Sequence, residues 1–295
     1  MNLNSLHTAV KIIECPRDAM QGLHDFVPTA LKIEYINKLL QVGFDTIDFG
    51  SFVSPKAIPQ LCDTADVLNG LDLSNTKSKL LAIIANVRGA IDACIHDQIK
   101  YLGFPFSISE TFQQRNTNSS IAQSFENVKV IQELCMKHGK ELVIYISMGF
   151  GNPYGDTWNT DVVSEWTEKI SSLGVNIISL ADTVGVAKPD DIRYIFKDLI
   201  PRFKSVEFGA HLHCTPDNWM EKTDAAYQSG CRRFDVAIKG FGGCPMASDK
   251  LTGNLATENL VHYLSSHNVE IDLDLNQLYN SIEFSNKIFN VSIEN

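Results

Sequence analysis

The chain has 295 residues, of which 44% are hydrophobic and 20% are charged, a composition that excludes disordered and fibrous proteins. Its 35 acidic and 25 basic residues give a formal charge of -10, and no cluster of lysine or arginine is present, which argues against binding to nucleic acid or to an anionic membrane. No stretch approaches about 18 apolar residues, and the first residues lack the features of a signal peptide, so we expect a cytoplasmic protein without a membrane span.

Eight short β-rich segments alternate with longer segments of helical periodicity along the whole chain. The predicted strands are Val10–Glu14, Thr46–Phe49, Leu80–Ile84, Tyr101–Phe104, Leu142–Ser147, Asn176–Leu180, Val206–Ala210 and Phe234–Ile238. Apolar residues repeat with a period of about 3.6 between them, as in the gap that follows the first strand. Strands that each precede a helix predict parallel βαβ units.

The length fits either two domains or one (β/α)8 barrel of about 250 residues. An open doubly wound sheet would usually carry a G-x-G-x-x-G turn after an early strand, but the first strand here runs into Cys15-Pro16-Arg17-Asp18. No Pro/Gly/Ser-rich linker divides the chain. We therefore predict an α/β fold with a single catalytic domain, a TIM barrel over about residues 9–270 with a C-terminal helical extension over about 271–295.

Seven cysteines are spaced irregularly and form no C-x-x-C pair, which is typical of reduced thiols rather than of a disulfide framework or a zinc site. Cys244 differs from the others because it follows Gly242-Gly243 and precedes Pro245. The two glycines allow the backbone to approach a ligand closely, and a thiol there could donate or accept a proton. A tight turn with an unimportant cysteine is the alternative.

Polar residues gather after the predicted strands, where the active site of such a barrel is built. These residues are Arg17, Asp18, Asp48, Ser109, Ser147, Asp182, Thr183, His211, His213, Cys244 and Asn254. Alternate residues of a strand face the same side, so His211 and His213 can converge on one divalent ion, and Asp18 can add an oxygen ligand. Arg17 can stabilise a negative charge on a substrate oxygen.

Simpler interpretations of these residues remain open. An Arg-Asp pair is more often a surface ion pair than part of an active site, and Asp182-Thr183 taken alone more often forms a turn or caps a helix. Asp48 ends a strand and could face a helix instead of the barrel mouth. The H-x-H pattern alone is weak, and its position at the end of the seventh strand is what favours a metal site.

Six motifs together resemble the 3-hydroxy-3-methylglutaryl-CoA (HMG-CoA) lyases, a family of metal-dependent barrels, from about Lys11 to about Leu264. The motifs are Pro16-Arg17-Asp18-Ala19-Met20-Gln21, Ser51-Phe52-Val53-Ser54-Pro55-Lys56, Ile178-Ser179-Leu180-Ala181-Asp182-Thr183-Val184-Gly185, His211-Leu212-His213, Gly242-Gly243-Cys244-Pro245 and Gly253-Asn254-Leu255-Ala256-Thr257-Glu258. Six motifs in the order of the family make a chance resemblance improbable.

The resemblance implies an enzyme that cleaves HMG-CoA to acetyl-CoA and acetoacetate by a retro-Claisen reaction. It implies a Mg2+ or Mn2+ ion bound by Asp18, His211, His213 and Asn254, and a homodimer. The catalytic residues that it implies are Arg17, Asp18, Asp182, His211 and Cys244. The residues expected to bind the acyl-CoA substrate are Gln21, Asp48, Ser109, Ser147 and Thr183.

Several positions depart from the family's pattern and put the exact acyl group in doubt. Asp48 stands where the family usually has Glu, Cys214 replaces an Asp, Val143 replaces an Arg, and the segment between Cys244 and Asn254 is one residue longer. A lyase for another 3-hydroxyacyl-CoA and a condensing synthase for a 2-oxo acid are the nearest alternatives. A barrel without activity that keeps the metal site for binding is a third.

Overall fold

Eight parallel strands close into a barrel in the computed structural model, which describes residues 9–243 and 252–289. The strands are β1 (Lys11–Glu14), β2 (Thr46–Ser51), β3 (Lys79–Ile83), β4 (Ile99–Ser107), β5 (Glu141–Ser147), β6 (Ile177–Ala181), β7 (Glu207–His211) and β8 (Arg233–Val236). Each strand pairs with its neighbours in sequence order, and β8 pairs with β1 to complete the ring. The predicted (β/α)8 TIM barrel is confirmed.

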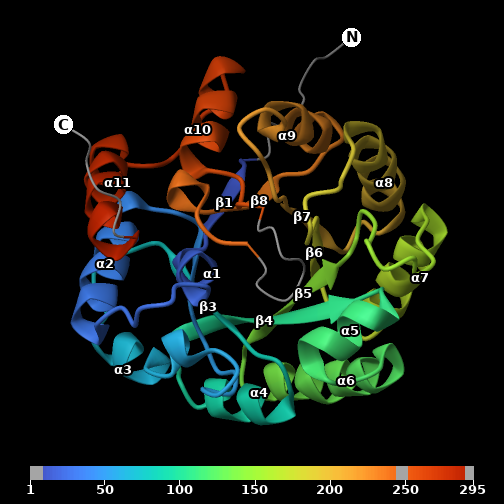
Figure 1. Cartoon of the computed structure of the whole chain (residues 1–295), viewed down its shortest axis with the longest axis horizontal. Helices are drawn as coiled ribbons and strands as arrows, with labels where there is room; N and C mark the ends of the chain where they lie inside the picture. Colours follow the sequence, from blue (N-terminus) through green and yellow to red (C-terminus); the bar gives the residue numbers. More distant parts are fainter. Residues whose placement is uncertain (1–8, 244–251, 290–295) are drawn as a thin grey trace.

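Helices surround the strands (Figure 1). They are α1 (Pro16–Gln21), α2 (Thr29–Val42), α3 (Thr64–Asn69), α4 (Val87–Cys94), α5 (Glu110–Thr117), α6 (Ile121–Lys137), α7 (Thr160–Ser171), α8 (Pro189–Arg202), α9 (Trp219–Gln228), α10 (Thr257–Ser266) and α11 (Leu275–Phe289), with short 3-10 turns η1 (Pro59–Leu61) and η2 (Ile238–Gly240). Helix α11 lies in the predicted C-terminal extension and packs against α2 (Figure 1). No helix among the described residues is long and apolar enough to cross a membrane.

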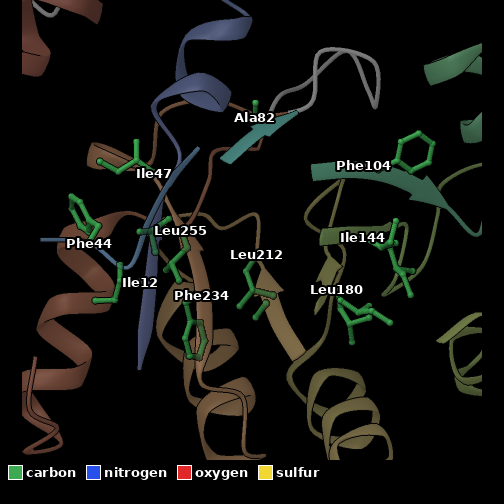
Figure 2. Close-up of a cluster of buried hydrophobic side chains, with 14 of the residues drawn as sticks. Ile12, Phe44, Ile47, Ala82, Phe104, Ile144, Leu180, Leu212, Phe234 and Leu255 are labelled. Carbon is green, nitrogen blue, oxygen red and sulfur yellow. The ribbon is translucent and has the colours of Figure 1, made fainter. Parts of the chain in front are cut away.

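The strands bury side chains on both faces, which explains their nearly continuous apolar sequences. Outward-facing residues such as Ile47, Phe104 and Ile144 pack against the helices in the main core, part of which Figure 2 shows. The alternating residues face the barrel interior, where Val143 and Tyr145 of β5 belong to a second, smaller cluster. This alternation sends every second residue at a strand end toward the barrel mouth.

All eight strands lie where the sequence predicts them, but β4 is longer than expected. It continues through Pro105 to Ser107, although proline is usually excluded from the interior of a sheet. The carbonyl of Gly103 accepts a hydrogen bond from the N–H of Ile84, so the backbone groups of Gly103, and those of Pro105 two residues later, face β3. At the level of Pro105, however, β3 has already ended at Ile83. Pro105 therefore removes no ladder hydrogen bond.

The buried carboxyl of Glu14 joins the end of β1 to the segment that follows β8. It accepts hydrogen bonds from the N–H of Ile238 (2.9 Å) and from the hydroxyl of Thr257 (2.6 Å). Burial raises the pKa of this carboxyl to about 8, and the two hydrogen bonds offset only part of the increase. The predicted strand Phe234–Ile238 ends early, at Val236, and Ile238 lies in η2.

We expect Glu14→Gln to remove a pH dependence of stability. Because the folded protein holds the proton more tightly than the unfolded chain, the free energy of unfolding of the wild type should fall as pH rises from about 4.5 to about 8. The amide can keep both hydrogen bonds without ionising. The difference between variant and wild type should therefore grow by about 1.4 kcal/mol per pH unit across this range. Urea titrations at several pH values measure it, and parallel curves would contradict the prediction.

Candidate active site and metal centre

A cavity of about 430 Å³ opens at the carboxyl ends of the strands. Polar residues that the sequence predicted line it together with apolar side chains. The predicted residues in its wall are Arg17, Asp18, Gln21, Asp48, Ser147, Thr183, His211 and His213. They come from five strand ends, and the closed barrel brings them together. This is the position expected for the active site of such a fold.

Helix α1 starts directly after β1 and turns Arg17 and Asp18 into the cavity. Pro16 occupies the first turn, where its missing N–H costs no helical hydrogen bond. In an extended strand the two neighbouring side chains would point to opposite faces. The helical turn instead lets both contribute to one site, and Nη1 of Arg17 donates to Asp18 Oδ1 at 3.0 Å.

Arg17 is buried and most of its hydrogen-bond donors are committed. Nε and Nη2 donate to the carboxylate of Asp48, and Nη1 donates to Asp18 and to Gln21 Oε1 (3.1 Å). Of the five N–H groups of a guanidinium, these bonds leave one on Nη2 for a substrate. Burial raises the pKa of Asp48 to about 6 despite Arg17, so the carboxylate is mostly ionised at neutral pH and fixes the guanidinium plane.

The residues present fit a divalent metal ion. Ligand atoms of Asp18, His211 and His213 all lie within 4.8 Å of one another. Six ligands around an ion such as Mg2+ lie about 3 to 4 Å apart, so these atoms can share one ion. Asn254 is adjacent, with its amide nitrogen 2.7 Å from Asp18 Oδ2, and an isolated bridge pairs its backbone with His213.

The pKa shifts of Asp18 and His213 favour the forms that bind a metal. That of His211 does not, because burial lowers its pKa but Asp235 and Asp18 outweigh burial and raise it. Burial raises the pKa of Asp18, but Arg17 and the two imidazoles outweigh burial, so its pKa lies below the ordinary value. Burial and the neighbouring His211 lower the pKa of His213 to about 3. A carboxylate and a neutral imidazole are the forms that bind a metal.

Gly242 explains why the segment before Cys244 needs glycine. Its φ is +105°, and a Cβ there would lie 2.6 Å from the amide nitrogen of Asn254 and 3.0 Å from the carbonyl oxygen of Asp18. The backbone thus approaches the metal centre closely, as the Gly-Gly pair suggests. Cys244 itself lies outside the described residues.

The ammonium group of Lys239 donates a hydrogen bond to the side-chain oxygen of Asn286 of α11.

Three predicted residues that the structure describes do not line the cavity: Asn254, which lies beside Asp18, and Ser109 and Asp182. The hydroxyl of Ser109 caps α5 and donates to Asp156, a residue of the segment after β5. The carboxylate of Asp182 accepts from Lys222 Nζ (2.7 Å) and from the N–H of Ala187 (2.9 Å). Neither side chain faces the substrate cavity, and both stabilise the segments that follow the strands.

Sequence reasoning missed Tyr145, Asp235 and Lys222. Tyr145 lines the cavity, and its buried hydroxyl has no hydrogen-bond partner. Asp235 is paired with His211 in the register of β7 and β8, and its Oδ2 lies 3.3 Å from His211 Nδ1. The alternation of side chains along β5 and β8 could have indicated Tyr145 and Asp235, because each lies an even number of positions from a residue of the same strand that faces the interior. No sequence pattern indicated Lys222.

Comparison with known proteins agrees with this geometry. Residues 9–284 match the family model described as HMGL-like. Hydroxymethylglutaryl-CoA lyase of Macaca fascicularis, described as mitochondrial, is 32% identical over 96% of this chain and 86% of that protein. The corresponding lyase of Bacillus subtilis is 30% identical over 91% of this chain and 89% of that protein. A solved HMG-CoA lyase from Acinetobacter baumannii, in complex with coenzyme A and 3-methylmalate, has a TM-score of 0.89 and 31% identity, covering 98% of this chain and 93% of that one.

Proposed function

The chain belongs to the HMGL-like family, and from this we propose that it is a metal-dependent carbon–carbon lyase that cleaves HMG-CoA to acetyl-CoA and acetoacetate. The observation that carries the proposal is the cavity in which Arg17 lies beside the ligand set of Asp18, His211 and His213. A cationic donor next to a metal site can stabilise the negative charge that develops on the oxygens of a 3-hydroxyacyl thioester during cleavage.

We propose that Asp18, His211, His213 and Asn254 hold a Mg2+ or Mn2+ ion. A donor set of two nitrogens and two oxygens suits Mn2+ and is acceptable for Mg2+. When bound, the ion supplies Lewis-acid polarisation of the oxygens of the substrate.

The family resemblance also predicts a homodimer, which stays a prediction.

The cleavage breaks the C2–C3 bond of the substrate, removes the proton of the C3 hydroxyl and leaves the enolate of a thioester. The free N–H of Arg17 is available to donate to the enolate oxygen. The hydroxyl of Thr183 accepts from the N–H of Met148 (2.9 Å), which leaves its own hydrogen to donate to the substrate. Ser147 lines the same wall.

Two groups are candidates for removing the proton of the C3 hydroxyl: Asp182 and the neighbourhood of His211. The contacts favour the neighbourhood of His211, which lines the cavity, because Asp182 is held by Lys222 and Ala187. The imidazole itself would use one nitrogen for the ion while its Nδ1 faces Asp235, so neither nitrogen is left to accept the proton. The thiol of Cys244 would then protonate the acetyl-CoA carbanion, which completes the proton balance. The substrate-binding roles of Gln21 and Asp48 are indirect, because both orient Arg17.

Incubating the Mn2+-loaded protein with HMG-CoA and measuring acetoacetate and acetyl-CoA tests the function. We expect both products in equal amounts. Product formation only from a different 3-hydroxyacyl-CoA would point to a related lyase, in keeping with Asp48 in place of the usual Glu. Mn2+ binding without turnover of any acyl-CoA would point to a barrel that has kept the metal site without the activity.

Cys244→Ser should lower turnover and leave metal binding intact. A serine hydroxyl is a much weaker acid than a thiol, so the loss of the proton donor should reduce kcat by about 10²–10⁴-fold. Steady-state kinetics with HMG-CoA, together with Mn2+ titration, measures both quantities. Cys62→Ser, a change at an exposed cysteine, is the matched control and should keep normal turnover. Near-normal kcat in Cys244→Ser would rule out the proposed role.

A further inference from the structure

Lys222 of α9 is a buried cation that contacts the backbone of a metal-ligand residue. Only 1% of its surface is exposed, and its Nζ donates to Asp182 Oδ2 (2.7 Å), to the carbonyl of His213 (2.9 Å) and to the carbonyl of Gly185 (3.0 Å). All three donors of the ammonium group are therefore used. The pattern of these contacts indicates more than the neutralisation of Asp182.

The carbonyl of His213 needs this partner because β6 is too short to supply one. In the β6–β7 ladder the carbonyl of His211 accepts from the N–H of Asp182 (2.9 Å), and the carbonyl two residues later would pair with the backbone of residue 184. However, β6 ends at Ala181 and the chain turns away over Asp182–Gly185. Lys222 Nζ takes the position of the missing N–H.

The opposite side of this segment is fixed by backbone contacts. The N–H of Cys214 donates to Gly253 (2.8 Å), and the N–H of Leu255 donates to Leu212 (2.9 Å). The segment that carries His213 is thus held between the 253–255 segment and Lys222. A buried carbonyl without a partner costs about 1–3 kcal/mol, so loss of the ammonium group would favour a shift of this segment.

We infer that Lys222 is a positioning residue of the metal centre, which holds the main chain of His213 so that its imidazole faces Asp18 and His211. The inference rests on the metal site of the proposed function and is independent of the substrate. Supporting residues around metal ligands typically contribute about 10–100-fold to metal affinity. If Lys222 only balanced the charge of Asp182, its removal would lower stability and leave metal affinity unchanged.

The test is the Mn2+ dissociation constant of the substrate-free protein, measured by electron paramagnetic resonance of the free ion. Lys222→Met should weaken Mn2+ binding by about 10–100-fold at a temperature where the variant is folded. Lys222→Gln keeps amide donors on a shorter side chain and should lie between the wild type and Lys222→Met. It keeps the inference testable if the methionine variant does not fold.

Lys32→Met is the matched control. Lys32 is equally buried in α2, where its Nζ bonds Asp63 and the carbonyl of Gln60, and none of these three residues lines the cavity. It should lose comparable thermal stability and keep Mn2+ affinity within about twofold of the wild type.

Folded Lys222 variants with wild-type Mn2+ affinity, or an equal loss of affinity in Lys32→Met, would overturn the inference. If the wild type binds no Mn2+, the proposed metal site fails as well. If the wild type binds Mn2+ and Lys222→Met weakens that binding, but HMG-CoA is not cleaved, the proposed reaction alone fails.

Discussion

Arg17→Met should reduce the kcat for HMG-CoA cleavage by at least about 10²–10³-fold, the usual cost of removing one donor to a developing oxyanion. The methionine side chain keeps much of the volume but supplies no donor for the enolate oxygen. It also leaves the buried carboxylate of Asp48 without its bidentate partner, which should lower the free energy of unfolding by about 3–5 kcal/mol. Acetoacetate formation and urea titration measure the two effects separately.

A double variant separates catalysis from stability at this position. Arg17→Met combined with Asp48→Leu removes the uncompensated charge, so it should recover much of the stability lost in the single variant. It should not recover turnover, because no donor has been restored. A single variant with kcat within tenfold of the wild type, or a double variant that regains activity together with stability, would exclude the role of Arg17.

His213→Ala should abolish tight binding of the divalent ion. The dissociation constant for Mn2+ should rise by more than about 10²-fold, since the loss of a direct ligand exceeds the 10–100-fold loss typical of supporting residues. His213 is buried, and its low pKa means that it is neutral, so the variant loses a ligand and no positive charge. Turnover at limiting Mn2+ should fall in parallel.

His138→Ala serves as the control for removing an imidazole elsewhere. His138 is exposed at the end of α6 and lies outside the cavity. Its alanine variant should bind Mn2+ as the wild type does. Mn2+ affinity in His213→Ala within about threefold of the wild type would show that the metal is held elsewhere, and it would remove the basis for the inference about Lys222.

The fold could be predicted because eight short β-rich segments alternate with segments of helical periodicity, and polar residues follow most of the strands. The limits of β4 could not, because Gly103 and Pro105 are unfavourable in most strands, and Pro105 is tolerated only where β3 has ended. Ser109 was predicted in the site because it follows the fourth strand, but its hydroxyl donates to Asp156 and does not face the cavity. It lies two residues after the true strand end and caps α5.

The sequence could place the predicted metal ligands Asp18, His211 and His213 near one another because each lies at or just after a strand end, whereas Asn254 was predicted from the family resemblance. The environment of Asp182 could not be predicted, because it depends on Lys222, which is 40 positions away on a helix with no recognisable motif. The pairing of Asp235 with His211 likewise requires the register of two strands. Contacts made through tertiary packing are therefore the part of the site that the sequence leaves open.

The pairing of β1 with β8 brings residues from the two ends of the barrel sequence together at the predicted metal centre. Asp18 and Asn254 are 236 positions apart, yet their side chains are hydrogen-bonded. A ribosome must therefore release nearly the whole chain before the catalytic centre can exist, and no shorter fragment can bind the ion through the full set of ligands. Contacts of such long range in the sequence slow folding.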